Sequence, residues 1–277
     1  MREQERFQVT FFTDLHHGDA EHGDFNCKRA FWKLGRILDA TAKSSFYVSL
    51  GDLVDFLHED STDLYEEAVA FLEKRDVCSQ TDGVSGRAVY HVLGNHESAF
   101  IEKQRLDAYI PHREGVGSTY IFRRGDVLFA VLDGNFDRAT GSDAPCVMRE
   151  SREFVFPPAQ IRWVKEELAR HMSDEIQTVV WLCHVAYKDI AENSREDMAR
   201  AFLSFGRPVL IFEGHTHIER FYSVAVDGKE IPVFTLAPVT FDFTVPEEKR
   251  AESFFCYTAT FEGGMLRSVE KHVGEAL

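Results

Sequence analysis

Residues 208–217, PVLIFEGHTH, join a short apolar run to a glycine and two histidines. The run is aliphatic and aromatic and ends where the polar residues begin, which is typical of a buried strand that leads into a loop. Core packing would explain one histidine here, but His215 and His217 come as a pair directly after Gly214. The rest of the chain decides whether this pair packs in a core or binds a ligand.

Four other segments show the same junction, an apolar run followed by polar residues. They are FQVTFFTD (7–14), FYVSLGDLVD (46–55), AVYHVLGNHE (88–97) and TVVWLCHVAY (178–187). Helical patterns lie between several of these runs, at residues 29–43, 63–74 and about 194–204. Alternating strands and helices predict βαβ units and a parallel sheet, so we expect the polar residues to gather along the edge where the carboxyl ends of the strands meet.

The remaining segments carry hairpin and loop signals. Residues 118–133 predict a hairpin that turns at 124–126, and the C-terminal part predicts two more, at Asp227-Gly228 and Gly263-Gly264. Residues 134–157 are polar and irregular, and Pro157-Pro158 then opens a helix with an apolar stripe. The sequence has no internal repeats or evident linkers, so we predict a single domain over residues 1–277.

Composition and charge narrow the class of protein. An apolar fraction of 44% and an aromatic fraction of 13% are those of a folded chain. A net charge of −15 would repel the phosphate backbone of a nucleic acid and an anionic membrane surface, so a nucleic-acid partner is unlikely. Five scattered cysteines without a C-x-x-C pair favour a reducing compartment. With no secretory signal and no membrane-spanning stretch, we expect a cytoplasmic protein.

Each of the five junctions carries residue types that bind metal ions. In chain order they are Asp14, His16, Asp52, Asn95, His96, His184, His215 and His217. Two pairs among them are spaced two apart, and in an extended segment this spacing points both side chains to the same side. Glycines at 51, 94 and 214 allow the backbone to turn and to approach closely. We therefore expect these side chains to converge on one site.

The ligand types indicate the metal. Imidazole nitrogens combined with carboxylate and amide oxygens suit manganese, iron or zinc rather than calcium. Without His96, the seven remaining residues of this set are too many ligands for one ion and suit two divalent or trivalent ions that share a carboxylate. Two metal ions about 3.5–4 Å apart are the usual clamp for phosphoryl transfer. The sequence therefore predicts a dinuclear centre that acts on a phosphate ester.

The ordered set D-x-H, G-D, G-N-H-E, H and G-H-x-H resembles the calcineurin-like metallophosphoesterase superfamily, from Asp14 to His217. The resemblance implies an α/β fold, a four-layer α/β/β/α sandwich of two mixed sheets flanked by helices. It also implies which residues bind the ions. One ion would be held by Asp14, His16 and His217, the other by Asn95, His184 and His215, and Asp52 would bridge the two.

The same resemblance implies a catalytic role for His96, which would protonate the leaving oxygen or stabilise the transition state. We expect the neighbouring Glu97 to orient its imidazole and to raise its pKa. The predicted reaction is hydrolysis of a small-molecule phosphomonoester or phosphodiester by direct attack of metal-bound hydroxide, with no covalent intermediate. A nucleotide-like substrate is favoured, and three aromatic residues could stack its base: Phe136, Phe154 and Phe156.

Three other functions stay open on the sequence. A phosphoprotein phosphatase of this superfamily has arginines where this chain has Phe56 and Leu93, which counts against that branch. A nuclease would need a basic track, which the net charge disfavours. A non-catalytic scaffold of the same fold would have lost ligands or the G-N-H histidine, and none is lost here.

Several residues near the motifs also have plainer interpretations. Taken alone, His184 would suit a core histidine and Asp52 a turn cap, but the ordered set favours metal binding for both. Asp55 is equally compatible with a loop or cap and with support of the centre. We expect His17 to lie outside the ligand set and Cys183 to point into the core. A third ion is less favoured than a solvated loop for Asp19, His22 and Asp24.

Overall fold

The computed structural model of the chain describes residues 5–18, 29–55, 61–79, 87–113, 115–137, 154–240, 245–246 and 253–274. Several sequence-based expectations fall outside these ranges. They concern most of the irregular segment at 134–157, the third-ion candidates Asp19, His22 and Asp24, and Phe56.

The first sheet has six strands in the order β14-β13-β1-β2-β4-β3. Its parallel part contains β1 (Arg6–Phe12), β2 (Phe46–Ser49), β3 (Cys78–Ser79) and β4 (Ala88–His91). The C-terminal hairpin of β13 (Phe254–Glu262) and β14 (Met265–Gly274) joins it antiparallel to β1. The first and last parts of the chain thus share one sheet.

The second sheet also has six strands, in the order β11-β12-β10-β9-β6-β5. Its parallel part contains β6 (Val127–Leu132), β9 (Thr178–Cys183), β10 (Val209–Glu213) and β12 (Lys229–Thr235). Antiparallel edge strands flank it, β5 (Tyr120–Arg124) beside β6 and β11 (Arg220–Val226) beside β12. The two sheets are therefore both mixed, as the sequence resemblance implied.

Alternation along β6 shows how the layers stack. Val127, Phe129 and Val131 belong to the core shared with the first sheet, in which Phe129 meets Phe7 with ring centroids 6.4 Å apart. The intervening residues 128, 130 and 132 belong to a separate core under two helices, α4 (Pro158–His171) and α5 (Glu192–Leu203). One face of the second sheet thus packs on the first sheet and the other on helices, as successive side chains of a strand point to opposite faces.

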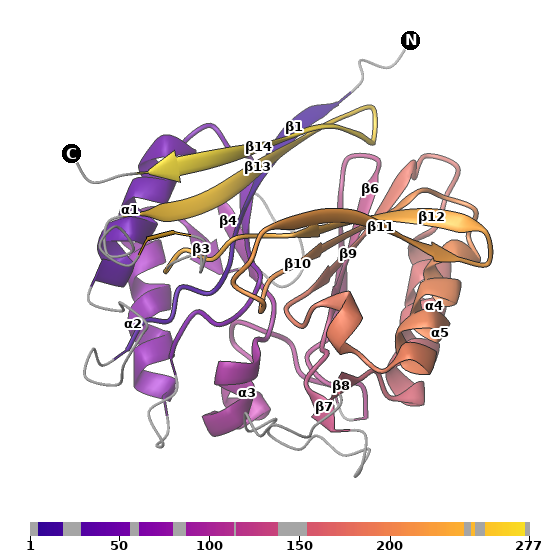
Figure 1. Cartoon of the computed structure of the whole chain (residues 1–277), viewed down its shortest axis with the longest axis horizontal. Coiled ribbons are helices and arrows are strands. Elements are labelled where there is room, and N and C mark those ends of the chain that lie inside the picture. Colours follow the sequence, from indigo (N-terminus) through magenta and orange to yellow (C-terminus); the bar gives the residue numbers. More distant parts are fainter. Residues whose placement is uncertain are drawn as a thin grey trace.

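Figure 1 shows the resulting four layers, with α1 (Ala30–Ala40) and α2 (Thr62–Glu73) outside the first sheet and α4 and α5 outside the second. The predicted α/β/β/α sandwich is confirmed. α1 and α2 form because apolar residues recur on one face of each, and those faces are buried. None of the helices in the described ranges has the length and apolar character that a bilayer crossing requires.

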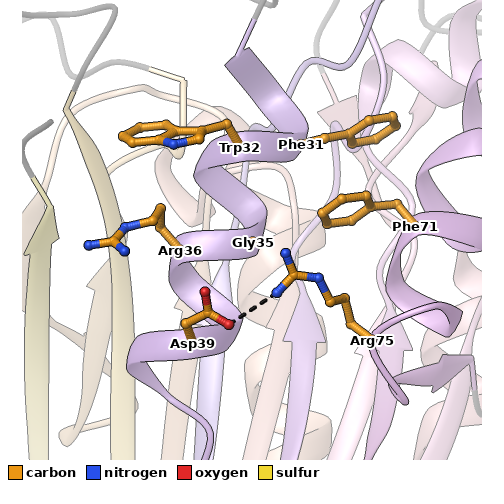
Figure 2. A pocket seen from close by; sticks show the side chains of 7 residues that line it. All are labelled: Phe31, Trp32, Gly35, Arg36, Asp39, Phe71 and Arg75. Carbon is orange, nitrogen blue, oxygen red and sulfur yellow. Dashed lines mark hydrogen bonds and ion pairs between the residues drawn. The ribbon is translucent and has the colours of Figure 1, made fainter.

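A shallow groove of about 320 Å³ lies on the outer surface of this helix pair, between aromatic and charged side chains. Figure 2 shows Phe31 and Phe71 on one side of it and Trp32 on the other, with Gly35 between them. The rings of Phe31 and Phe71 stack with centroids 4.8 Å apart. The groove therefore passes over α1 at Gly35, where no side chain fills the space between these rings.

The structure differs from the sequence-based expectation in how the strand ends are arranged. The alternation of strands and helices alone predicted that the junctions share one edge of a parallel sheet, but they are divided between two mixed sheets, as the resemblance implied, with β1, β2 and β4 in one and β9 and β10 in the other. Short elements also lie where the sequence predicted irregular structure: β7 (Phe136–Asp137) pairs with β8 (Phe154–Val155). The hairpin turns at 124–126, 227–228 and 263–264 lie where they were predicted.

Candidate metal centre

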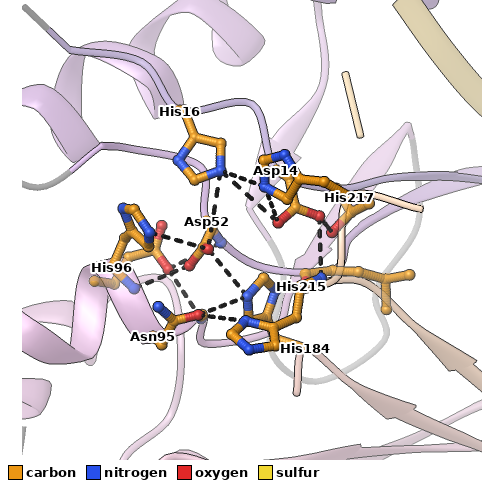
Figure 3. Close-up of polar contacts among 12 residues, drawn as sticks. Asp14, His16, Asp52, Asn95, His96, His184, His215 and His217 are labelled. Atoms are coloured by element: carbon orange, nitrogen blue, oxygen red, sulfur yellow. Dashed lines mark hydrogen bonds and ion pairs between the residues drawn. The ribbon is translucent and has the colours of Figure 1, made fainter. Parts of the chain in front are cut away.

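The structure brings together all eight side chains that the sequence singled out, from the carboxyl ends of β1, β2, β4, β9 and β10 (Figure 3). Two clusters of His and Asp atoms lie here with every ligand atom within 4.8 Å of the others: Asp14 with His16 and His217, and Asp52 with His184 and His215. A third such cluster joins His16 to Asp55 and His96. The site therefore lies where the two sheets meet. The roles of these residues as ligands stay predictions.

The backbone at the site is strained. Among the described residues, seven other than glycine have a positive φ, and five of these are the predicted ligands Asp14 (53°), His16 (48°), Asp52 (50°), His215 (71°) and His217 (53°). This left-handed conformation costs an L-residue roughly 1–2 kcal/mol, and residues held in it cluster at functional sites. We expected extended backbone to align the paired residues. That is wrong, because the chain curls at these positions.

The first cluster is organised around Asp14. Its Oδ1 lies 3.2 Å from Nε2 of His217 and 3.8 Å from Nε2 of His16, and the two Nε2 atoms are 3.0 Å apart. Its other oxygen accepts hydrogen bonds from the Thr13 hydroxyl at 2.6 Å and from the backbone N–H of His215 at 3.2 Å. These bonds fix the carboxylate so that Oδ1 faces the two imidazoles.

The second cluster is organised around His184. Its Nδ1 donates a hydrogen bond to the carbonyl of Leu50 at 2.8 Å, and because a carbonyl only accepts, Nδ1 carries the hydrogen. Nε2 then faces Oδ2 of Asp52 and Oδ1 of Asn95, both at 3.0 Å. The same amide oxygen lies 2.8 Å from Nδ1 of His215. A backbone hydrogen bond that orients a ligating imidazole is typical of metal sites.

Asp52 lies between the two clusters. Its Oδ2 is 3.0 Å from Nε2 of His184 and 4.0 Å from Nε2 of His16, while its Oδ1 accepts the backbone N–H of His96 at 2.9 Å. Close packing around it requires Gly94, where a Cβ would lie 2.1 Å from Oδ1 of Asp52. Asp52 is thus the one predicted ligand whose carboxylate faces both groups.

The charges of the two clusters depend on each other. Burial alone would raise the pKa of Asp14 and of Asp52. The nearby imidazoles outweigh burial and lower both pKa values, mainly His217 in the case of Asp14 and His184 in the case of Asp52. Burial likewise opposes protonation of His184, yet the Asp52 carboxylate prevails and raises the pKa of His184 to about 9. Burial and the nearby His184 lower the pKa of His215 to about 4. The site therefore holds buried negative charge that attracts positive charge.

These residues fit a pair of metal ions. Oδ1 of Asp14 is buried and accepts no hydrogen bond within the described part of the chain. In the second cluster, Nε2 of His184 points at Oδ2 of Asp52 and Oδ1 of Asn95, two oxygens that can only accept, so this contact needs either a proton or a metal ion between the atoms. Lone pairs that face one another are unfavourable unless a cation binds between them, and the mixture of imidazole and oxygen donors suits manganese, iron or zinc.

His96 lies at the start of α3 (Asn95–Phe100), beside the two clusters. Its Nδ1 is 3.0 Å from Oδ1 of Asp55, and its Nε2 is 3.7 Å from Oδ2 of Asp52. Burial opposes the charged imidazole, but Asp52 and Asp55 outweigh it and raise the pKa of His96. The sequence left two interpretations of Asp55, a loop or cap residue and a residue that supports the centre. Its contact with His96 agrees with the second.

Glu97 contributes to raising the pKa of His96, as we expected, but it does not hydrogen-bond to that imidazole and so does not orient it. Its buried carboxylate instead accepts four backbone N–H groups, from Leu53 at 2.6 Å, Gly94 at 2.9 Å, and Asp52 and Val54 at 3.1 Å. It thus ties the loop after β2 to the start of α3. A glutamate three residues after a helix N-cap is a known sequence signature, so this role was readable from G-N-H-E.

The neighbouring residues that the sequence discussed lie around this centre. Nε2 of His17 is 3.0 Å from a carboxylate oxygen of Glu67, and its ring stacks on Phe31, so it faces the helix layer. Cys183 is buried in the core under α4 and α5, as expected. Leu93 is buried, and its carbonyl accepts a hydrogen bond from the side chain of Asn135 at 3.0 Å.

A family model described as calcineurin-like phosphoesterase, Metallophos, matches residues 7–219. The chain therefore belongs to the calcineurin-like phosphoesterase family. Members of this family typically bind a dinuclear metal centre, and the clusters described above are this chain's candidates for it. The match spans every sequence motif from Asp14 to His217.

Solved structures are more distant. The chain is similar to the sulfate thiohydrolase SoxB of Thermus thermophilus, crystallised with glycerol, with a TM-score of 0.47 and 11% identity over 97% of this chain. It spans 56% of the SoxB chain, little more than half of its length. Vps29 of Chaetomium thermophilum has a TM-score of 0.34 and 14% identity, over 97% of this chain and 98% of that one. A comparison with curated proteins found no match.

Proposed function

We propose that the protein is a metal-dependent phosphoesterase that hydrolyses a small-molecule phosphodiester or phosphomonoester, with a nucleotide-like ester favoured. The family membership supports hydrolysis of a phosphate ester. The observation that carries the proposal is the convergence of seven ligand-type side chains from five strand ends of two sheets. The net charge of −15 supports a small substrate over a nucleic acid.

Each cluster would hold one ion. Asp14, His16 and His217 would bind the first, Asn95, His184 and His215 would bind the second, and Asp52 would contribute to both. When bound, the pair of manganese, iron or zinc ions would lower the pKa of a water molecule and neutralise negative charge on the phosphate oxygens.

His96 supplies the proton in this proposal. Hydrolysis joins a water oxygen to phosphorus and breaks the bond from phosphorus to the leaving oxygen, which then needs a proton. Asp55 holds Nδ1 of His96 at 3.0 Å and leaves Nε2 on the side of Asp52, where it can donate that proton. A positioned general acid contributes on the order of 10²–10⁴ in rate.

The test uses protein purified without added metal, followed by elemental analysis and assays of p-nitrophenyl phosphate and bis-p-nitrophenyl phosphate with Mn²⁺. We expect bound transition metal, and a rate reduced on the order of 10²-fold or more for His96→Ala and for Asp52→Ala. The matched control is His17→Ala, because His17 adjoins His16 in sequence but faces α1 and α2. Wild-type turnover in both His96→Ala and Asp52→Ala would refute the proposal.

A further inference from the structure

One predicted ligand of the candidate centre is more exposed than the others. Six of its seven predicted ligands have exposed fractions of 0–5%. His215 is the exception, because its side chain is half-buried. His215 is therefore the predicted ligand that solvent reaches most, and we call the residues that contact its imidazole the mouth of the site.

Phe154, in β8, lies at this mouth. Its ring meets the His215 imidazole edge to face, with centroids 5.5 Å apart and planes at 83°. Phe154 is half-buried and packs at the margin of the core under α4 and α5. A partly exposed aromatic residue therefore lies next to a predicted ligand of the second ion.

The backbone of Phe154 is held from both sides. β8 pairs with β7, so that Phe154 lies opposite Asp137. On its other side Phe154 forms a bridge with Ile190, and its carbonyl accepts the N–H of Ala191 at 2.8 Å. Because the backbone is fixed, a ligand that packs on the ring has only the side-chain torsions of Phe154 left to order.

The two other aromatic residues of this segment are occupied by packing. Phe136 is buried, with Nζ of Lys103 4.3 Å from its ring centroid. Phe156 is buried against Trp181, with ring centroids 5.3 Å apart. Of the three rings that the sequence offered as a stacking surface, all of them among the described residues, Phe154 is thus the least buried.

We propose that Phe154 is a specificity residue, which favours phosphate esters that carry an aromatic ring, such as a nucleobase, by packing against that ring at the mouth of the site. This inference rests on the proposed function for the position of the phosphate. It goes beyond that function because it concerns the aromatic ring of the substrate, which does not react. Flat aromatic rings pack on exposed phenylalanine by stacking, which tolerates any base.

The test compares AMP with ribose 5-phosphate, which share the phosphate and the sugar and differ in the base. Binding is measured by calorimetry on Mn²⁺-loaded full-length protein carrying His96→Ala, so that turnover does not consume the ligand. Stacking on one aromatic side chain predicts that AMP binds about tenfold more tightly than ribose 5-phosphate. Adding Phe154→Leu should remove most of this preference by weakening AMP alone, and Phe154→Trp should keep it.

Two controls separate stacking from a structural role. Phe221→Leu removes an exposed phenylalanine from β11 and should leave the preference intact. The manganese content per chain should be the same with and without Phe154→Leu. Equal affinity for the two ligands in the parent, an AMP preference that survives Phe154→Leu, or an equal loss for both ligands would each overturn the inference. Because the ratio is a binding measurement, it stands or falls independently of whether wild-type protein hydrolyses any ester.

Discussion

Replacing Glu97 with Gln should destabilise the protein strongly, although the two side chains have nearly the same shape. The Glu97 carboxylate is buried and accepts four backbone N–H groups, two at each oxygen. Burial and the nearby Asp52 raise the pKa of Glu97 to about 7. A proton on either oxygen would face N–H donors, so this geometry favours the ionised carboxylate.

The magnitude follows from the donors that Gln cannot satisfy. Whichever way the amide is turned, its oxygen can accept from one pair, either Leu53 and Val54 or Asp52 and Gly94, and its NH₂ faces the other pair. Leaving a buried donor unsatisfied costs about 1–3 kcal/mol, so two donors cost about 2–6 kcal/mol. That is a large part of a typical unfolding free energy of about 5–15 kcal/mol.

The assay is urea denaturation of Glu97→Gln and wild type in the presence of EDTA, so that metal binding does not contribute. Glu270→Gln, an exposed change in β14, is the matched control and should stay within about 0.5 kcal/mol of wild type. A second expected result is a lower manganese affinity of Glu97→Gln, because the loop that carries Asp52 loses its support. A loss of stability below about 1 kcal/mol would refute the reasoning from the four hydrogen bonds.

Two further predictions concern positions away from the centre. Gly35→Ala in α1 should raise the unfolding free energy by about 0.5–1 kcal/mol, measured by urea denaturation, because alanine favours the helix. Its Cβ would lie 3.1 Å from the guanidinium of Arg75, the end of a long side chain that pairs with Asp39 at the surface, and 3.6 Å from the ring of Phe71 (Figure 2). A loss of stability would show that the Arg75 side chain cannot shift to make room. Burial lowers the pKa of His91 to about 3, so the unfolded chain binds a proton below about pH 6.5 that the folded protein does not, and stability is lost as the pH falls. The unfolding free energy should therefore be lower at pH 4.5 than at pH 6.5 by about 2–3 kcal/mol because of His91. His91→Gln should remove this amount from the difference in unfolding free energy between the two pH values, measured by urea denaturation in EDTA, and an unchanged difference would contradict the prediction.

The convergence of the site was predictable because it depends on local signals. Each junction is an apolar run followed by polar residues, and the resemblance of the ordered motifs to the calcineurin-like family implied two groups and a shared Asp52. The division of the strand ends between two sheets was not readable from the runs themselves. β4 and β9 look alike as sequences, and their sheet membership is decided by partners elsewhere in the chain, β2 for β4 and β6 for β9.

The roles of Asp55 and Glu97 show a second limit. Glu97 follows His96 directly, and adjacency suggested that it would orient the imidazole. At the start of a helix, however, a side chain in the third position turns back toward the N-cap, so Glu97 meets Gly94 and the β2 loop. Asp55 reaches His96 from a different strand, a contact that depends on how β2 and β4 pair. Neighbours in sequence are thus poor guides to neighbours in a site built from loops.

The backbone strain gives an argument for function that is independent of any motif. Five residues of the site hold left-handed backbone, and the three histidines among them, at roughly 1–2 kcal/mol each, cost about 3–6 kcal/mol in total, since aspartate tolerates this conformation better. This is of the same order as the whole unfolding free energy of a typical protein. A core that needed only to pack would relieve such strain by placing glycine or asparagine at these positions. Their occupation by Asp14, His16, Asp52, His215 and His217 follows if the side chains themselves are required, since carboxylates and imidazoles supply donors that a metal pair needs and glycine does not.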